Sequence, residues 1–196
     1  MRPVVLLDCD GVLSDFITAT LDVLRQRTGQ TFQHDDISTW EVFASLPEEL
    51  QLHKSKVYDY LKKEGGCLGI PLYAGAQDGV ERLQAIAEVI IVTSPFKGSP
   101  TWTHERELWL EKYFHIQHEN VIHAKRKEFV SGDFLIDDKP DNLRAWRTTH
   151  PNGRAIYWKN PKFSEPTPGY VLCTQSWDEV IEEVKRFVAG ASMSYA

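Results

Sequence analysis

Four short apolar runs, each ended by polar or turn residues, are the feature that most limits the folds open to this chain. They are rich in Val and Ile and cover residues 4–7, 89–92, 134–136 and 155–158. Continuous apolar runs of this length are typical of strands that are covered on both faces, as in parallel sheets. Residues 121–122 and 171–173 are weaker strand candidates. The sequence therefore predicts a parallel sheet.

Helical patterns lie between the predicted strands. Residues 78–87 place an apolar stripe on one helical face, and Ser176 to Glu179 resemble a capping box before a last helix. Residues 102–114 also have helical spacing, with a predicted apolar face of Trp102, Leu108, Trp109 and Tyr113. Strands that alternate with helices predict a doubly wound, Rossmann-like α/β core.

The connection from Asp15 to Val89 is far longer than the dozen or so residues that a crossover needs. Within it we expect helices at 16–27 and 46–63, ended by glycines, and a return linker at 70–75. The predicted organisation is a small, mostly helical cap inserted after the first strand and covering the carboxyl edge of the sheet. Its boundaries are 1–15 and 74–189 for the core, 16–73 for the cap and 190–196 for a flexible tail.

Charge and cysteine content exclude several classes of protein. The net charge is −6 and the pI is near 5.6, which disfavours a nucleic-acid polymer as partner. No segment approaches the roughly 20 apolar residues of a membrane span, and acidic residues interrupt the apolar N-terminus. The three cysteines are odd in number and lack CxxC spacing, so neither disulfides nor a zinc site are predicted. We expect a cytoplasmic protein.

The sequence Asp8-Cys9-Asp10-Gly11 follows the first predicted strand directly. Ligands of open α/β sheets bind beyond the carboxyl ends of the strands, so both carboxylates are expected at the binding edge. Two such groups can hold a hard cation and divide nucleophilic and acid–base roles, while Gly11 lets the chain turn sharply. The alternative is a turn with solvated aspartates.

Three further polar groups follow the same logic. Thr93 and Ser94 end the second strand, where hydroxyl and backbone N–H groups suit a phosphate oxygen or simply cap the next segment. Asp137 and Asp138 end the third strand, and two buried carboxylates would repel unless a cation neutralises them; a solvated turn is the alternative. The basic run 125–127 before that strand either supplies one cation to the site or is solvated surface.

These pieces, in this order, resemble the haloacid dehalogenase (HAD) superfamily of phosphatases. The sequences from Asp8 to Phe16, Thr93-Ser94-Pro95, Glu111-Lys112-Tyr113 and 132–139 are similar to the 5′(3′)-deoxyribonucleotidases. The resemblance covers the core and is weak across residues 30–70. Cys9 also stands where relatives of that family have Met.

The resemblance implies a role for each site residue. Asp8 would be the nucleophile and Asp10 the general acid and base. Thr93, Ser94 and Lys127 would hold the phosphate, Lys127 being selected because that family has a Lys ten residues before the acidic pair. Mg²⁺ would be held by the Asp8 carboxylate, the Asp10 backbone carbonyl and Asp138, with Asp137 nearby or acting through water. Phe16 lies eight residues after Asp8, where the cap begins, so we expect its ring to contact the leaving group; packing against neighbouring cap residues is the alternative.

The predicted activity is therefore the Mg²⁺-dependent hydrolysis of nucleoside monophosphates to nucleoside and phosphate. One alternative is a HAD phosphatase for another small phosphomonoester, because the cap selects the leaving group. The other is a non-catalytic nucleotide-binding protein on the same fold. The expected partner is a small-molecule substrate, with neither a nucleic-acid polymer nor a membrane. The oligomeric state stays open, with a homodimer as one candidate.

Overall fold

The computed structural model describes residues 2–159 and 169–193 of the chain. Its sheet has six parallel strands in the order β3-β2-β1-β4-β5-β6. The strands are β1 (Val4–Leu7), β2 (Glu88–Thr93), β3 (Val121–His123), β4 (Phe134–Asp137), β5 (Arg154–Trp158) and β6 (Leu172–Thr174). The predicted doubly wound α/β class is confirmed, and β1 has the predicted bounds.

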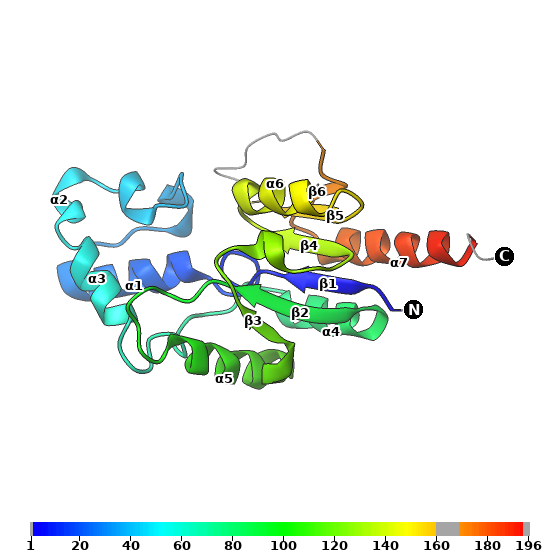
Figure 1. The fold of residues 1–196 in the computed structure, drawn as a ribbon. Helices are drawn as coiled ribbons and strands as arrows, with labels where there is room; N and C mark the ends of the chain where they lie inside the picture. The colour runs from blue at the N-terminus through cyan, green and yellow to red at the C-terminus, as the bar shows by residue number, and fades with distance from the viewer. Residues whose placement is uncertain (1, 160–168, 194–196) are drawn as a thin grey trace.

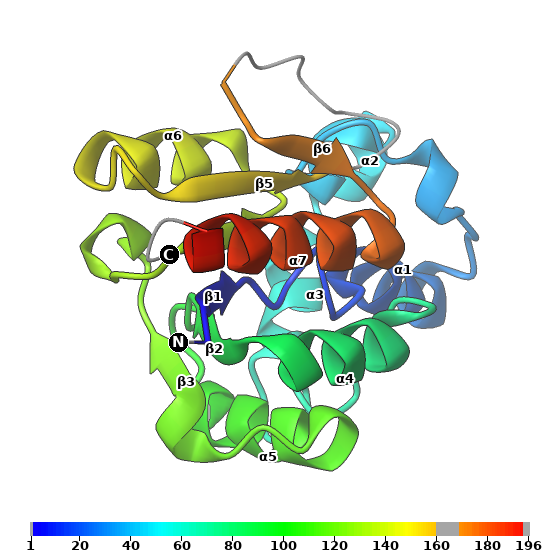
Figure 2. The same ribbon diagram turned by 90° about the vertical axis from the view of Figure 1, so that its right-hand side faces the viewer.

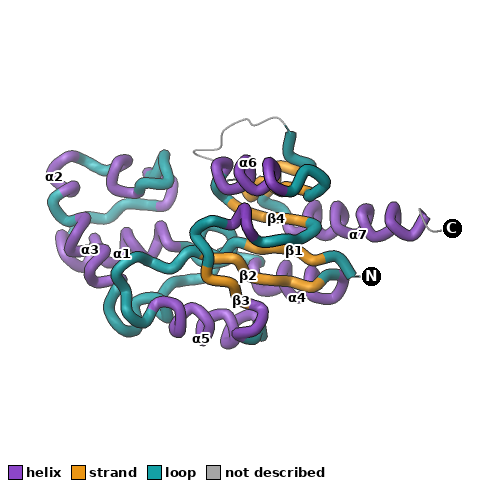
Figure 3. The backbone as a smooth tube through the Cα atoms, viewed as in Figure 1, coloured by secondary structure: helices purple, strands orange, loops and turns teal. Residues whose placement is uncertain are grey.

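Helices cover both faces of the sheet (Figures 1 and 3). One face packs against α4 (Ala76–Ile86), α5 (Trp102–Phe114) and α7 (Trp177–Met193). The other packs against α6 (Pro140–Thr149), where Trp146 and Leu143 are buried beside Leu6 and Leu135. Alternate residues of β1 thus enter different cores, because successive strand side chains point to opposite faces.

The predicted apolar face of α5 is partly wrong. Trp102 and Trp109 are buried, but Leu108 is 42% exposed. Two charged residues, Glu105 and Arg106, are buried on the helix instead. Periodicity counts apolar residues only, so it could not anticipate charged groups that are held inside by partners described below.

The segment between β1 and α4 carries α1 (Phe16–Thr28), α2 (Glu48–Gln51), α3 (Lys54–Leu61) and the short 3-10 turns η1 (His34–Asp36) and η2 (Val42–Ser45). The single helix expected at 46–63 is therefore two short ones. This segment lies beyond the carboxyl ends of the strands, away from both labelled termini (Figure 1). It has its own apolar cluster, which includes Leu24, Phe43 and Val57.

Two short backbone contacts join the outgoing and returning chain where this segment meets the core. Ser14 bridges Leu72, and the Tyr73 N–H donates to the carbonyl of Leu13 at 2.9 Å. At the other end of the chain, α7 continues to Met193. Residues 190–193 of the predicted tail are thus helical, and 194–196 lie outside the described residues. The turns η3 (His118–Asn120) and η4 (Lys127–Phe129) complete the described elements. Figure 2 shows α7 beside α4, against which it packs.

Candidate active site

The register of the sheet brings the predicted site residues to one edge. Leu7 of β1 lies beside Ile91 of β2 and Ile136 of β4, so the residues that follow these three positions emerge together. These are Asp8, Thr93 with Ser94, and Asp137 with Asp138. Their convergence follows from parallel pairing alone, because all parallel strands end at the same edge.

Three buried carboxylates meet at this edge. Asp8, Asp137 and Asp138 each offer an oxygen within 4.8 Å of the others. Burial raises the pKa of Asp8 to about 6 although the ammonium of Lys127 opposes the shift, and burial together with Asp8 and Asp137 raises the pKa of Asp138 well above its usual value. Such a group of like charges favours either protons or a cation.

Lys127 joins two of the three carboxylates. Its Nζ lies 2.6 Å from Asp8 Oδ1 and 2.7 Å from Asp137 Oδ2, and the side chain is 2% exposed. Burial would lower the pKa of Lys127, but Asp137 and Asp8 outweigh it and raise the pKa, so the side chain stays cationic. Within the basic run 125–127, Lys125 and Arg126 are exposed, and only Lys127 turns inward.

Asp137 and Asp138 differ sharply in their partners. Both oxygens of Asp137 accept hydrogen bonds, from Lys127, from the side chain of Asn142 at 2.9 and 3.1 Å, and from the backbone N–H of Lys139 at 2.8 Å. Asp138 Oδ1 is buried and, among the described residues, has no hydrogen-bond partner. The adjacent pair predicted from sequence therefore divides into a saturated carboxylate and an unsatisfied one.

Gly11 makes the approach of the first loop to Asp138 possible. It has φ +87°, and a Cβ built there would lie 2.1 Å from Asp138 Oδ2. A side chain at this position would meet both backbone strain and a clash. The glycine is thus required twice, for the turn and for the contact.

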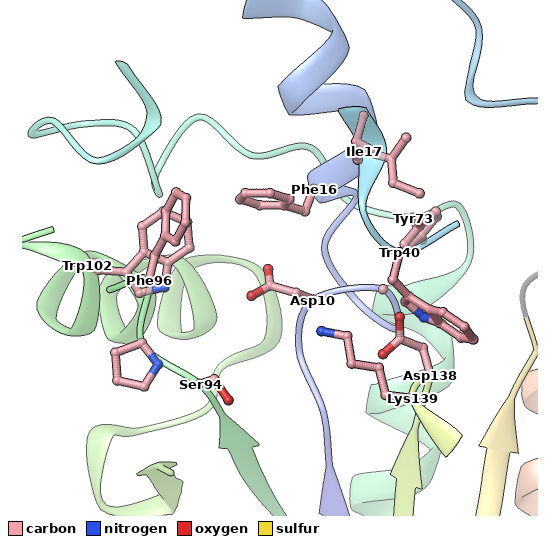
Figure 4. Close-up of a pocket in the computed structure, with 13 residues that line it drawn as sticks. Asp10, Phe16, Ile17, Trp40, Tyr73, Ser94, Phe96, Trp102, Asp138 and Lys139 are labelled. Carbon is pink, nitrogen blue, oxygen red and sulfur yellow. The ribbon is translucent and has the colours of Figure 1, made fainter. Parts of the chain in front are cut away.

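A cavity of about 260 Å³ lies beside Asp138 and Gly11, which both line it. Its wall contains Asp10, Ser94 and Asp138, and most of its remaining lining is apolar or aromatic: Phe16, Ile17, Trp40, Val42, Tyr73, Pro95, Phe96 and Trp102. Figure 4 shows Asp10 between the aromatic rings and the ammonium of Lys139. Burial would lower the pKa of Lys139, but the surrounding carboxylates, Asp138 first, raise it.

The predicted residues occupy distinct places in this arrangement. Phe16 lines the cavity and also packs edge-on against Phe96 at 5.5 Å, so it has both a binding and a packing surface. Ser94 lines the cavity, and its hydroxyl donates to the carbonyl of Ala124 at 3.4 Å. Thr93 is 1% exposed, and its Oγ1 has no partner among the described residues.

Sequence reasoning missed several lining residues. Phe96 follows Thr93-Ser94-Pro95 directly, so its place after a strand end was an available signal. Trp102 was assigned to the apolar face of a helix, and its ring reaches the cavity as well. Trp40 and Tyr73 come from the inserted segment, where the sequence predicted no site residue other than Phe16.

Comparison with known proteins identifies the family. Residues 2–189 match the family model described as "5′ nucleotidase, deoxy (Pyrimidine), cytosolic type C protein". The chain belongs to this family. It is accordingly a hydrolase of the class that acts on phosphoric monoesters. The human mitochondrial 5′(3′)-deoxyribonucleotidase is 32% identical over 70% of this chain and 62% of its own length.

Solved structures agree on the fold of this nucleotidase-family protein. A haloacid dehalogenase-like family hydrolase from Streptococcus pneumoniae has a TM-score of 0.57 at 17% identity, covering 93% of this chain and 98% of its own. YfnB from Bacillus subtilis, whose structure contains bound magnesium, has a TM-score of 0.59 at 16% identity over 93% of this chain and 98% of its own. The predicted resemblance to the 5′(3′)-deoxyribonucleotidases is confirmed by the family match, and the fold is that of HAD-like hydrolases.

No helix within residues 2–159 and 169–193 combines the length and apolar character of a membrane span. The cytoplasmic location and the homodimer stay predictions.

Proposed function

We propose that this protein is a Mg²⁺-dependent phosphomonoesterase that hydrolyses deoxyribonucleoside or ribonucleoside monophosphates through an aspartyl-phosphate on Asp8. The observation that carries the proposal is the buried group of Asp8, Lys127 and Asp138, of which Asp138 lines a cavity whose other walls are largely aromatic. A phosphate could meet these charged groups while a nucleoside occupies the apolar walls.

The residues present fit a magnesium ion. Mg²⁺ prefers oxygen ligands, and the site offers two carboxylate oxygens: one from Asp8, and the buried Asp138 Oδ1, which has no hydrogen-bond partner among the described residues. We assign Asp8, Asp138 and the Asp10 backbone carbonyl as its ligands. Asp137 is already saturated by Lys127, Asn142 and the Lys139 N–H, so its role is to orient Lys127. When bound, Mg²⁺ would neutralise negative charge on the transferring phosphoryl group.

The first chemical step transfers the phosphoryl group to Asp8. Asp8 Oδ1 accepts the Cys9 N–H at 2.8 Å and the Lys127 ammonium at 2.6 Å, so the other oxygen is the one available for attack on phosphorus. A bond forms between Asp8 and phosphorus as the bond from phosphorus to the sugar oxygen breaks. Asp10 donates a proton to that leaving oxygen.

The second step hydrolyses the intermediate. Asp10, now ionised, takes a proton from water, whose oxygen bonds to phosphorus as the bond to Asp8 breaks. Thr93, Ser94 and Lys127 would hold the phosphoryl oxygens in both steps; the unpartnered Thr93 hydroxyl is suited to donate to one of them. Catalysis of phosphoryl transfer depends mostly on such positioning and charge neutralisation.

The inserted segment would act as the cap that selects the leaving group. Phe16, Trp40 and Tyr73 all come from residues 16–73 and line the cavity. Trp40 and Tyr73 lie across it from Phe96 and Trp102, whose rings pack against Phe16 (Figure 4). Flat apolar walls favour a nucleobase over a plain sugar. The division into core and cap is thus part of the proposal.

The test is phosphate release from a panel of nucleoside monophosphates and sugar phosphates, with Mg²⁺ and with excess chelator. We expect Mg²⁺-dependent release, fastest from nucleoside monophosphates, and none from Asp8→Asn, which should still fold. Faster release from sugar phosphates would favour the phosphatase for another small substrate. Nucleotide binding without release would favour the non-catalytic alternative.

A further inference from the structure

A fully buried arginine from α5 lies directly against Asp10. The side chain of Arg106 is 0% exposed, and its Nη2 lies 2.7 Å from Asp10 Oδ1. Its Nη1 donates to Cys9 Sγ at 3.1 Å. A guanidinium is always charged, and burying it is costly unless it is paired. Among the described residues, Arg106 forms an ion pair with one carboxylate, that of Asp10, which has the acid–base role proposed above.

Aromatic rings fix the orientation of that guanidinium. Arg106 lies 5.3 Å from the ring centre of Trp102 and 5.1 Å from that of Trp109. Cation–π contacts with two rings leave a planar guanidinium little freedom to rotate. The direction in which Arg106 offers its N–H groups is consequently set by the packing of α5.

Asp10 receives a second donor at the same oxygen. The Ser14 hydroxyl donates to Asp10 Oδ1 at 2.6 Å. No described residue donates to Oδ2, and the carboxylate lines the cavity (Figure 4). Two donors on one oxygen hold the carboxylate in one orientation and leave the other oxygen for the substrate.

Both donors belong to the joint between core and cap. Ser14 bridges Leu72 on the returning chain. Glu105, the neighbour of Arg106, accepts the backbone N–H groups of Gly65 at 2.9 Å and Cys67 at 3.0 Å. The first turns of α5 thus hold the end of the cap and the Asp10 carboxylate together.

We propose that Arg106 is a positioning residue for Asp10: together with Ser14 it holds Oδ1 so that Oδ2 delivers the proton to the leaving oxygen. This rests on the role of Asp10 in the proposed function. Among the described residues, no hydrogen bond or ion pair joins the Arg106 side chain to Asp8, Lys127 or Asp138, so its removal should impair proton transfer and spare phosphate attack. That separation makes the role measurable.

The experiment compares two leaving groups in the first turnover, with Mg²⁺ present. A deoxyribonucleoside leaves as an alkoxide and needs a proton, whereas p-nitrophenolate leaves without one. We expect Arg106→Met to slow first-turnover release of the nucleoside by about ten- to a hundredfold and that of p-nitrophenolate by less than about threefold. Arg106→Lys, which keeps one donor and the charge, should recover most of the loss.

A double-variant cycle separates positioning from general structural damage. In an Asp10→Asn background, Arg106→Met should slow nucleoside release by less than about twofold further, because residues that act through one group are not additive. Arg154→Met is the matched control: Arg154 also lies 2.7 Å from a carboxylate, that of Glu183, with its guanidinium over the Phe187 ring. Circular dichroism and thermal midpoints establish folding, and Arg106→Lys carries the comparison if Arg106→Met does not fold.

The outcomes distinguish this inference from the proposed function. Equal slowing of both leaving groups, additive losses in the cycle, or the same loss in Arg154→Met would overturn the positioning role. A slow Asp10→Asn enzyme beside a normal Arg106→Met enzyme would overturn this inference alone. An Asp10→Asn enzyme with the unaltered first-turnover rate would overturn the role of Asp10 and this inference with it.

Discussion

Replacing Lys127 by Met removes a cation that contacts both Asp8 and Asp137. The ammonium is almost completely buried and lies within 2.7 Å of an oxygen on each carboxylate. Removing one partner of a buried ion pair costs about 3–5 kcal/mol, because the remaining charge is left unpaired. Domains have about 5–15 kcal/mol of stability, so the variant should fold but unfold at markedly lower urea concentration.

The loss should depend on pH in a defined direction. In the wild-type protein without metal, Asp8 already has a pKa of about 6, above its ordinary 3.8. Removing Lys127 raises it further, so the folded state binds protons more strongly than the unfolded state. Stability then falls as pH rises from about 4 to above 6. The destabilisation of Lys127→Met, measured in chelator, should accordingly be larger at pH 8 than at pH 5.5.

The assay is urea unfolding followed by tryptophan fluorescence, together with phosphate release in Mg²⁺. Lys125→Met is the matched control, since Lys125 belongs to the same basic run but is exposed. We expect Lys127→Met to lose about a hundredfold or more in turnover and Lys125→Met to change little. Equal, small effects of the two substitutions on stability and turnover would refute the reasoning.

The remaining predictions concern the first loop, the cavity and the thiols. Because its Cβ would meet Asp138, Gly11→Ala should lower the free energy of unfolding in urea by about 2–5 kcal/mol and remove most Mg²⁺ binding in titration calorimetry. Gly29 has φ +73° but open space around it, so Gly29→Ala should lose less than about 2 kcal/mol. Similar losses in the two variants would contradict the close approach of Gly11 to Asp138. Phe16→Ala should lower kcat/KM for a deoxynucleotide by roughly ten- to a hundredfold, because stacking on a base contributes about 1–3 kcal/mol. The loss for a simple alkyl phosphate, which has no base, should be far smaller. Equal losses for the two substrates would show that Phe16 has a structural role only. In iodoacetamide labelling followed by mass spectrometry, the exposed Cys173 should react. Cys67 is buried, which raises the pKa of its thiol to about 12, so it should stay unmodified until the protein unfolds. Labelling of Cys67 in the folded protein would contradict its burial.

The strands could be predicted because a parallel sheet buries both faces and leaves a continuous apolar signature. The helix α6 gave no comparable signal: of its ten residues only Pro140, Leu143 and Trp146 are buried. The expected helix at 46–63 is interrupted at Leu52 and His53, where the chain turns between α2 and α3. A sequence pattern shows which residues are apolar but does not show such a change of direction.

The floor of the site was predictable for the same reason, since strand ends converge at one edge. The sequence pattern could not show which side chain forms a hydrogen bond or ion pair with each carboxylate of the site. Arg106 lies 96 residues from Asp10 along the chain, in a helix where the sequence pattern marked only apolar residues. The different roles of Asp137 and Asp138 likewise depend on Asn142 and Lys127, whose side chains reach them only in the folded protein.

The most direct measurement of the central claim is a rapid acid quench during the first turnover of a deoxyribonucleoside monophosphate carrying a radiolabelled phosphate, followed by peptide mapping. If Asp8 is the nucleophile, the label appears transiently on the peptide containing Asp8, accumulates in the presence of Mg²⁺ and not in chelator, and is not trapped by Asp8→Asn. Phosphate release at the full rate with no labelled peptide at any time, or label retained in Asp8→Asn, would show that Asp8 does not form the intermediate.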